Sequence, residues 1–413
     1  MYEQQRVAVI GAGAAGMMAA IHAAQNGASV TVFEKTDRVG KKLAITGKGR
    51  CNVTNDCDTQ ELLKNIISNP KFLYAAFNNF DTADTKAFFE CLGVPLKTER
   101  GRRVFPVSDK AMDIVLSLKR HMLDLGCELK HEAVTEIISE NGRIKGVKTR
   151  TGQYFYDSVV IATGGASYPT TGSDGDGYRF AKSLGHTVTP LVPSLVPLET
   201  VEDVSEIMGV SLKNVTLKIR NKQNGKVVFE EMGEMLFTHF GLSGPLVLSA
   251  SCHMAKMERG KYEALIDFKP VLDEKTLDNR VLSDFSKQLN RDFGNALGGL
   301  LPSKIIPFMV KKCGIDPMTK VNAVTKEQRA RLISTLKSLT LEIAGFRPIR
   351  EAIVTQGGIS VSEINPSTME SKLIKGLYLA GEVIDVDAYT GGYNLQIAFS
   401  TGALAGMHAA WGE

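Results

Sequence analysis

The pattern of apolar residues predicts a sheet whose strands come from both ends of the chain. Arg6–Ile10 and Ser29–Phe33 are short apolar runs rich in β-branched residues, and a helix-like stretch that runs to Gly27 separates them. A third run, Ser158–Gly165, stops at glycines, and a fourth, LIKGLYLAGEVID at 373–385, leads through a glycine turn into an apolar helix. This alternation of strand and helix is typical of a Rossmann-type α/β sheet.

The segments between these runs have other patterns. An amphipathic run over 109–125 predicts a helix with Ser108 as its N-cap and a glycine just beyond its end. Turn pairs at 141–142 and 151–152 separate short strands, which predicts a small antiparallel meander.

These changes of pattern divide the chain into four parts. Residues 1–193 and 346–413 form the first and second parts of one Rossmann-type domain, because strand and glycine-turn signals return after 345. Residues 194–272 are a β-rich insert and residues 273–345 a helical insert. A length of 413 residues agrees with more than one core, since single cores stop growing at about 250 to 300 residues.

Composition narrows the class of protein. With 43% hydrophobic and 23% charged residues the chain has the composition of an ordinary soluble protein, and its net charge of +4 is spread without long basic runs. We therefore expect no nucleic-acid partner. The N-terminus lacks the pattern of a signal peptide, and the weakly charged stretch 236–255 is broken by histidine, glycine and proline, which predicts a cytoplasmic protein without a membrane span. The sequence does not predict the oligomeric state.

The first candidate for chemistry is the motif GAGAAG, which places Gly11, Gly13 and Gly16 in a G-x-G-x-x-G pattern. In a dinucleotide fold the first glycine permits a tight turn, the second lets the backbone approach a pyrophosphate, and the third lets the helix pack on the strand. Glu34, at the end of the second predicted strand, would accept hydrogen bonds from a ribose diol. This fingerprint fits NAD and FAD equally well.

A glycine- and lysine-rich loop, RVGKKLAITGKGRCNVTN at 38–55, follows this unit and has no apolar period. Its glycines suggest close approach of backbone to a flat or phosphorylated ligand. Near the C-terminus, Glu382 ends a predicted strand, and the N-terminal turn of the following helix spans 392–395. In flavoproteins these two features lie at the ribitol chain and at the O2/N1 edge of the flavin, where the helix dipole stabilises negative charge.

The order of motifs along nearly the whole chain resembles the BaiN-like family of NAD(P)/FAD-dependent oxidoreductases, relatives of the fumarate reductase flavoprotein group. The motifs are GAGAAG, GKGRCNVTN, RRVFP, IATGGASYPTTGSDGDGY, EMLFTHFGLSGP, TQGGIS and LAGEVIDVDAYTGGYNLQIAFSTG. The resemblance implies a glutathione-reductase-type FAD-binding Rossmann domain, interrupted by an insert with a β-barrel part and a helical part. Patterns of this family often have SGGGRCN where this chain has TGKGRCN, so Lys48 is a departure that adds a charge near the cofactor.

Together the motifs and the resemblance predict a non-covalent FAD site, and the family name suggests NAD(P)H as electron donor. We expect no metal site, because the six cysteines form no CxxC pair and have no regular spacing. The expected cofactor-binding residues are Gly11, Gly13, Ala14, Ala15, Gly16, Glu34, Lys35, Lys41, Lys42, Gly49, Arg50, Cys51, Asn52, Val134, Ala162, Thr163, Gly164, Gly165, Gly381, Glu382, Asp387, Gly392, Tyr393, Asn394 and Leu395.

Cys51 and Cys57 raise the alternative of a redox-active disulfide beside the cofactor. Their C-x5-C spacing differs from the C-x4-C of flavin disulfide reductases, and no second G-x-G-x-x-G follows a strand between 150 and 350. We therefore expect Cys51 to pack at or tune the flavin as a single residue, with Cys57 incidental.

The predicted reaction is hydride transfer between flavin N5 and a small organic substrate, such as reduction of an enone-like C=C bond. It needs a donor or cation at the carbonyl oxygen and a proton source. The catalytic candidates are His239, Arg103 and Arg347, with Arg102 and Tyr389 as further choices. A flavin-dependent RNA-modifying enzyme and a flavin-binding protein without turnover remain alternatives.

Overall fold

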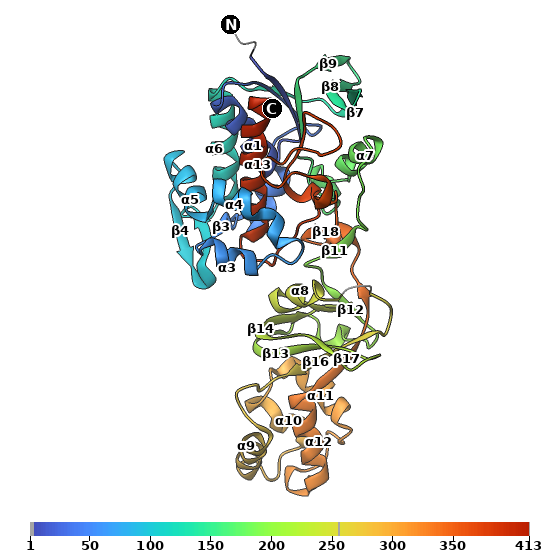
Figure 1. Ribbon diagram of the computed structural model, residues 1–413. Coiled ribbons are helices and arrows are strands. Elements are labelled where there is room, and N and C mark those ends of the chain that lie inside the picture. Colours follow the sequence, from blue (N-terminus) through green and yellow to red (C-terminus); the bar gives the residue numbers. More distant parts are fainter. Residues whose placement is uncertain (1–3, 255–256, 413) are drawn as a thin grey trace. The chain divides into compact units, whose positions relative to one another are not determined.

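The chain forms two units in the computed structural model, which describes residues 4–254 and 257–412 (Figure 1). The first unit contains the chain up to Ser194 and again from Ile349 onward, and the second unit is Leu195–Pro348. Each unit has its own hydrophobic core.

The first unit is built on a five-stranded parallel sheet of order β19-β10-β1-β2-β6. The strands are β1 (Arg6–Ile10), β2 (Ser29–Phe33), β6 (Glu128–Lys130), β10 (Ser158–Ile161) and β19 (Leu377–Leu379). The residues of β1, β2, β10 and β19 are largely buried, as expected for a parallel sheet covered on both faces, whereas those of the edge strand β6 are exposed or partly exposed. The Rossmann sheet with strands from both ends of the chain is therefore confirmed.

Helices α1 (Ala14–Gln25) and α13 (Tyr393–Trp411) pack against each other beside this sheet (Figure 1). Glycines make this contact very close: a Cβ at Gly402 would lie 2.4 Å from the carbonyl oxygen of Ala15, and one at Gly406 would lie 2.1 Å from that of Ala19. Both contacts advance by four residues in the same direction, so the two helices run parallel.

Smaller elements complete the first unit. Two antiparallel sheets, β3-β5-β4 and β7-β8-β9, and a two-stranded pair, β11-β18, accompany the main sheet. Their bounds are β3 (Thr54–Asn55), β4 (Leu96–Glu99), β5 (Arg103–Pro106), β7 (Val134–Glu140), β8 (Arg143–Thr149), β9 (Gln153–Phe155), β11 (Val192–Ser194) and β18 (Val354–Gln356). The β7-β8-β9 sheet confirms the predicted meander. The remaining helices of at least six residues are α2 (Lys41–Gly49), α3 (Thr59–Lys64), α4 (Tyr74–Asn79), α5 (Thr82–Cys91), α6 (Ala111–Asp124) and α7 (Asp176–Ser183).

Two local predictions for this unit were wrong. The helix predicted from residue 109 is α6, whose N-cap is Lys110, so Ser108 is not the N-cap. Asp109 cannot begin a helix because its φ is 57°. The stretch 38–55 is not an irregular loop throughout, since it contains the helical turns of α2, and left-handed residues interrupt that helix at 47–48.

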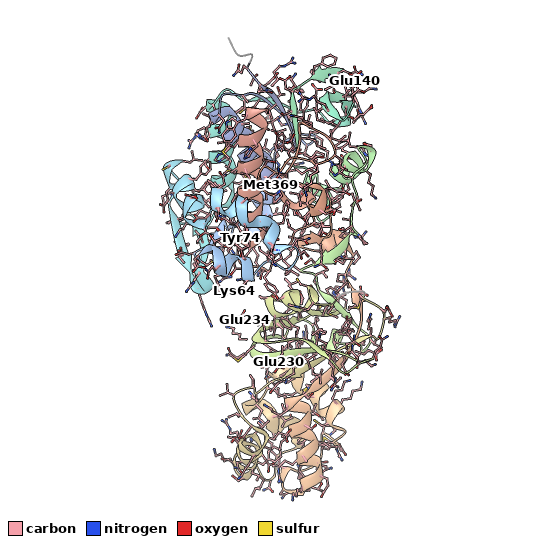
Figure 2. The ribbon with its side chains drawn as sticks, in the orientation of Figure 1. Lys64, Tyr74, Glu140, Glu230, Glu234 and Met369 are labelled. Atoms are coloured by element: carbon pink, nitrogen blue, oxygen red, sulfur yellow. The ribbon has the colours of Figure 1, made fainter. Side chains whose placement is uncertain are left out.

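The second unit contains a closed barrel of order β12-β15-β14-β13-β16-β17. Its strands are β12 (Leu198–Thr200), β13 (Ser211–Asn221), β14 (Val227–Phe237), β15 (Gly241–Ser243), β16 (Tyr262–Asp267) and β17 (Leu339–Phe346). The exposed side chains of Glu230 and Glu234 extend from β14 (Figure 2). Helix α8 (Pro245–Ser251) follows β15 and packs on β14, and α9 (Glu274–Ser286), α10 (Phe293–Ala296), α11 (Ile306–Cys313) and α12 (Lys326–Lys337) lie between β16 and β17.

One boundary in the second unit differs from the prediction. Residues 273–345 were expected to be helical, but Leu339–Phe346 form β17, which closes the barrel between β12 and β16. Alternate residues of β17 are buried in the barrel, from Leu339 through Leu341 to Ile343. This period of two was obscured because the segment directly follows the strongly helical pattern of α12.

In the described part of the chain, no helix is both long and apolar enough to cross a membrane.

Within the first unit, a buried histidine creates a pH dependence. His22 on α1 lies 5.5 Å from the ring of Phe80 and 6.4 Å from that of Phe88, between ring centroids. Its Nε2 is buried without a hydrogen-bond partner among the described residues. Burial, assisted by the neighbouring charge of His121, lowers the pKa of His22 to about 4.

We predict that acid destabilises the first unit partly through His22. The unfolded chain binds a proton near pH 6.5 and the folded chain only near pH 4, so stability is complete above pH 6.5 and falls as the pH drops through this window. Between pH 7 and pH 5 the loss is about 2 kcal/mol. Urea unfolding at both pH values should show a smaller decrease in the His22→Phe variant, and an equal decrease would contradict this assignment.

Candidate active site

The glycine motif forms the turn between β1 and α1 in the way the sequence predicted. Gly11 has φ 99°, and a Cβ there would lie 2.7 Å from the carbonyl oxygen of Ala162. A Cβ at Gly16 would lie 1.8 Å from the oxygen of Gly11, so the helix is packed directly on the turn. At Gly13, in contrast, a Cβ would meet nothing within 4 Å. The motif therefore leaves open space only where a phosphate would approach the backbone.

Glu34 is 8% exposed and its carboxylate is held by the backbone. The N–H of Ala12 donates to Oε2 at 2.9 Å and the N–H of Thr36 donates to Oε1 at 2.8 Å. These bonds fix the carboxylate beside the glycine motif, where each oxygen retains acceptor capacity for a ribose hydroxyl.

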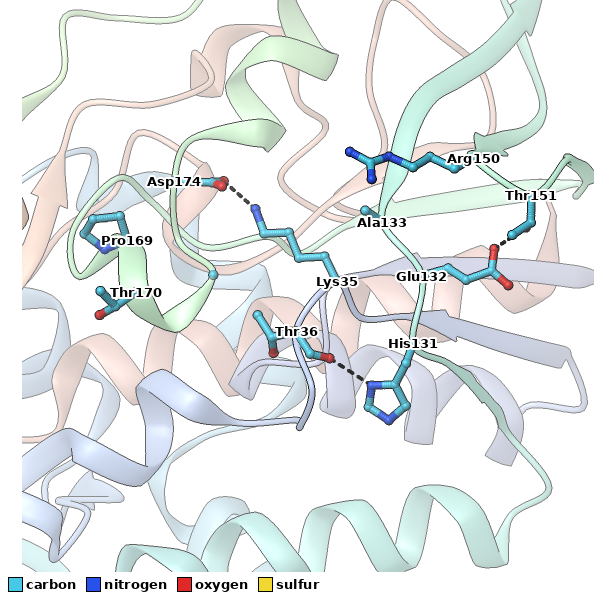
Figure 3. Close-up of a pocket in the computed structure, with 11 residues that line it drawn as sticks. Lys35, Thr36, His131, Glu132, Ala133, Arg150, Thr151, Pro169, Thr170 and Asp174 are labelled. Carbon is cyan, nitrogen blue, oxygen red and sulfur yellow. Dashed lines mark hydrogen bonds and ion pairs between the residues drawn. The ribbon is translucent and has the colours of Figure 1, made fainter.

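A cavity of about 620 Å³ is lined in part by Lys35, the residue that follows Glu34 in the sequence (Figure 3). Its lining comes from the end of β2, the segment before β7, the turn after β8 and the 169–174 loop, and consists of Lys35, Thr36, His131, Glu132, Ala133, Arg150, Thr151, Pro169, Thr170, Gly172 and Asp174. The ammonium of Lys35 contacts the carboxylates of Asp174 at 2.5 Å and Asp176 at 2.8 Å. The predicted contact Val134 begins β7 directly after Ala133 of this cavity. The cavity has the size and polarity for the adenosine end of a dinucleotide.

Several helices of this unit begin at glycines, and three of these glycines belong to the predicted site or its neighbouring loop. Gly13, Gly40 and Gly392 are the N-caps of α1, α2 and α13, and none of the three helices has a side-chain cap. The N–H of Gly40 donates to the carbonyl of Ala12 at 2.8 Å, which brings the start of α2 to the start of α1. Uncapped helix N-termini attract negative charge.

The parallel contact of α1 with α13 fixes the spacing of two of these N-termini. Gly402 lies on Ala15, and α13 begins nine residues before that contact, whereas α1 begins one residue before it, a difference of eight residues. At 1.5 Å per helical residue, the N-terminus of α13 extends about 12 Å beyond that of α1. An elongated ligand with two electronegative regions would fit this spacing.

Glu382 is the centre of a hydrogen-bonded cluster. Its Oε2 contacts Nζ of Lys42 at 2.5 Å, and its Oε1 accepts from the N–H of Thr355 at 2.8 Å and the hydroxyl of Ser167 at 3.2 Å. Nζ of Lys42 also contacts Oγ of Ser167 at 2.7 Å. Gly165 leaves room for this cluster, since a Cβ there would lie 2.7 Å from Oε1 of Glu382. Segments that are far apart in the sequence, those of Lys42, Ser167 and Thr355, thus meet at the carboxylate of Glu382.

Ser167 and Thr355 were not among the predicted site residues. Ser167 follows the glycine turn after β10 by two residues, and Thr355 belongs to the TQGG motif. The sequence contains a sign that each could belong to the site, because each is a small hydroxyl residue beside a glycine motif. It does not show that both side chains reach Glu382.

The other residues of the 162–165 turn and the lysine Lys41 have structural partners. Thr163 packs its Oγ1 against Gly177, where a Cβ would lie 2.2 Å away, and a Cβ at Gly164 would lie 2.7 Å from the hydroxyl of Ser173. Lys41 pairs with Asp37 at 2.5 Å. Oγ1 of Thr163 is buried and has no hydrogen-bond partner among the described residues, so this predicted contact stays a prediction.

The N-terminal turn of α13 is held from behind by β3. A Cβ at Gly392 would lie 2.3 Å from the backbone of Thr54. The side chain of Asn394 bonds to the backbone N–H and carbonyl of Ala388 at 3.0 and 2.8 Å, so it fixes the preceding loop. Burial raises the pKa of Tyr393 to about 12. A ligand at this turn could therefore contact the backbone groups of residues 393–395.

Gly381 and Asp387 serve the architecture of this region. A Cβ at Gly381 would lie 2.7 Å from that of Ala15. Asp387 is 1% exposed, its Oδ2 accepts from the hydroxyl of Ser194 at 2.9 Å, and burial raises its pKa. Its bond to Ser194 ties the end of β11 to the loop before α13.

The 46–52 segment turns sharply. Gly47, Lys48, Gly49 and Cys51 all have left-handed backbone. Oδ1 of the next residue, Asn52, is buried and has no hydrogen-bond partner among the described residues. An orphaned acceptor of this kind is expected where a ligand donor completes the site.

Arg50 anchors this segment from outside. Its guanidinium contacts Glu99 and Asp109 at 2.5 Å each and lies 4.2 Å from the ring centroid of Phe105. These partners occupy the guanidinium, which was predicted to hold the cofactor.

The cysteines of the segment do not have the properties of a redox pair. Cys51 and Cys57 are both buried free thiols. Burial raises the pKa of Cys51 to about 12 and that of Cys57 to about 11. Because the thiolate is the reactive form, both side chains are poor nucleophiles.

Two of the three catalytic candidates meet in the second unit. His239 is exposed in the turn after β14, and its ring centroid lies 4.9 Å from that of Phe240. The guanidinium carbon of Arg347 lies 4.6 Å from the same phenyl centroid, and Nη1 contacts Glu199 at 2.7 Å. Arg103 belongs to the first unit, where it is exposed and its Nε donates to the carbonyl of Arg100 at 3.1 Å.

Comparison with known proteins decides the family. The model of the HI0933-like protein Rossmann domain matches residues 5–408. The chain belongs to the HI0933-like family. This assignment confirms the resemblance inferred from the motifs.

Two known proteins align with this chain over almost its full length. A 3-dehydro-bile acid delta(4,6)-reductase of Clostridium scindens is 32% identical over 98% of this chain and 99% of its own length. A ribosomal RNA dihydrouridine synthase of Escherichia coli is 31% identical over 95% of both chains. The solved 3-ketosteroid-delta4-(5alpha)-dehydrogenase of Rhodococcus jostii RHA1 has the same fold, with a TM-score of 0.51 at 17% identity over 98% of this chain and 97% of that one.

The glycine motif yields a prediction with a matched pair of variants. Gly13→Ala should fold normally, because its Cβ meets nothing, but should weaken dinucleotide binding about tenfold by occupying the phosphate position. Gly16→Ala should instead lower the free energy of unfolding by about 3 kcal/mol or more, since its Cβ overlaps the backbone of Gly11. Urea unfolding and nucleotide titration separate the two effects, and equal stability of both variants would refute the packing account.

For the cysteines we predict that the Cys57→Ser variant binds cofactor and turns over as the unmodified protein does. In the folded protein, Cys51 and Cys57 should react with iodoacetamide far more slowly than the exposed Cys91, because both are buried and their pKa values are raised. Mass spectrometry of the alkylated peptides measures the rates. Loss of activity in Cys57→Ser would restore the disulfide interpretation.

Proposed function

We propose that this protein is an FAD-dependent reductase that reduces a C=C bond conjugated to a carbonyl group, with NAD(P)H as electron donor. The spacing of the α1 and α13 N-termini carries the assignment of FAD. A pyrophosphate at Gly13 and an electronegative ring edge at Gly392 require the long ligand that FAD provides through its ribityl chain.

The protein groups of the first unit fit this cofactor. The adenosine would occupy the cavity beside Lys35, with its ribose hydroxyls on Glu34. The ribityl hydroxyls would meet Glu382, whose position Lys42 fixes. The orphaned Oδ1 of Asn52 would accept a hydrogen bond from the flavin ring.

The reaction class rests on what the two full-length relatives have in common. The names of a bile acid delta(4,6)-reductase and of a dihydrouridine synthase both denote saturation of a C=C bond, and in each compound that bond is conjugated to a carbonyl. When bound, the flavin supplies a hydride from N5 to such a bond. The protein then has to polarise the carbonyl oxygen and deliver a proton to the neighbouring carbon.

We propose His239 and Arg347 for these two tasks, with Arg103 as a further candidate. His239 is exposed and can exchange its proton with solvent. Arg347 is held by Glu199 and by the ring of Phe240, which also contacts His239. This shared contact would keep a cation and a proton donor together.

A second candidate is reduction of uridine in RNA, which the 31% identity to a dihydrouridine synthase favours. Two observations argue in the other direction: the net charge of +4 is spread without long basic runs, and Glu234 is exposed on β14 (Figure 2). We therefore place a small-molecule substrate first.

For the FAD-loaded protein we predict that NADH or NADPH bleaches the flavin bands without oxygen, and that an added conjugated ketone restores them. The His239→Asn variant should still be bleached at the normal rate, but its reoxidation by the ketone should slow about 100-fold, because only the second step needs its proton. Stopped-flow absorbance measures both steps. Reoxidation by ribosomal RNA with formation of dihydrouridine, and not by the ketone, would replace the first candidate by the second. No reoxidation by either would refute the reductase assignment.

A further inference from the structure

Two basic residues of the first unit have backbone conformations that favour glycine. Nine described residues other than glycine have left-handed φ, and the basic ones among them are Lys48 and Arg102, at 58° and 56°. The neighbouring glycines Gly47, Gly49 and Gly101 adopt the same conformation without steric cost. A long side chain at either position is strained relative to glycine.

Neither side chain is fixed by a direct polar contact, although the charge of Arg102 helps to lower the pKa of Asp56. Lys48 and Arg102 are both exposed, and within the part of the chain that the structure describes their side chains make no hydrogen bond and no ion pair. Arg50 offers a contrast in the same region, since two carboxylates hold its guanidinium. The strain at Lys48 and Arg102 is therefore not compensated by contacts inside the molecule.

Strand β3 connects both basic residues to the start of α13. The segment of Lys48 runs directly into Thr54, whose backbone lies against Gly392. The side-chain amide of Asn55 donates to the carbonyl of Gly101 at 3.0 Å and to that of Gly391 at 3.1 Å. One amide thus ties the turn that presents Arg102 to the turn that precedes α13. Strained backbone maintained by surrounding contacts is typical of functional sites.

We propose that Lys48 and Arg102 form an anion-recognition site beside the N-terminus of α13, so that the substrate of this enzyme carries a carboxylate or phosphate group. This inference rests on the proposed function, which places the flavin ring at that N-terminus. The two cations select acidic substrates, and the strain is retained for this selection.

Stability measurements test the strain. At saturating FAD, Lys48→Gly and Arg102→Gly should each raise the melting temperature by about 2 °C, because glycine relieves the left-handed conformation. Lys48→Ala removes the same charge and keeps the strain, so its melting temperature should not rise. Lys182→Ala, an exposed lysine of α7, serves as the charge control.

Ligand binding tests the selection, with dissociation constants taken from the change in flavin absorbance and not from turnover. The carboxylate pair is 3-oxo-4-cholenoic acid and its methyl ester, and the phosphate pair is uridine 5′-monophosphate and uridine. The unmodified protein should bind the acidic member of one pair at least about fivefold more tightly, which corresponds to a screened charge contact. Lys48→Gly and Arg102→Gly should lose this preference, while Lys48→Arg and Lys182→Ala should keep it.

A preference for 3-oxo-4-cholenoic acid over its methyl ester would identify a carboxylate as the recognised group. A preference for uridine 5′-monophosphate over uridine would identify a phosphate. Equal affinity for acidic and neutral members in both pairs, or a preference that survives in Lys48→Gly and Arg102→Gly, would overturn the inference. Failure of the proposed function has a different signature, since a protein that takes up no FAD would give no flavin absorbance to perturb.

Discussion

The close parallel contact between α1 and α13 is the constraint on which the site depends. Gly402 and Gly406 bring the backbone of α13 onto Ala15 and Ala19, and any larger side chain at these glycines would collide with a carbonyl oxygen. The contact sets how far the N-terminus of α13 extends beyond that of α1. It thereby joins a helix near the end of the chain to the nucleotide motif at its beginning, and the second unit can be inserted between them without disturbing this spacing.

Around this frame, the charges of the first unit are held by partners that define their roles. Backbone N–H groups fix Glu34, and Lys42 with Thr355 fixes Glu382, so both carboxylates are held as hydrogen-bond acceptors at defined positions. Arg50 is bound to two carboxylates and braces the 46–52 segment. Lys48 and Arg102 differ, because within the described residues their side chains form no direct ion pair or hydrogen bond. Cations that have an ion-pair partner hold the structure, whereas cations without one are available to a ligand.

Much of the fold could be predicted because its signals are local. β1 and β2 have apolar runs with clear ends, and the glycine motif has one physical explanation for each position. β17 escaped prediction because its alternating pattern directly follows a helix, and pairing with strands distant in sequence decides its conformation. The start of α6 was misplaced because the left-handed backbone of Asp109 cannot be read from residue type.

The candidate site was predictable to the same extent. Gly13 caps α1 and Glu34 follows β2, as their motif predicted, and their contact with the cofactor stays a prediction. Arg50 was expected to face the cofactor, but its direction depends on Glu99 and Asp109, which lie far along the chain. Ser167 and Thr355 were missed because only the tertiary fold brings them to Glu382.

The central claim is that the two helix N-termini and Glu34 hold one FAD. Its most direct test is to release the bound nucleotide by heat from protein purified without added cofactor, and to identify and count it by chromatography. The account predicts FAD, released without proteolysis, in a ratio approaching one per chain. Release of another nucleotide, or a colourless protein that does not take up added FAD, would contradict it.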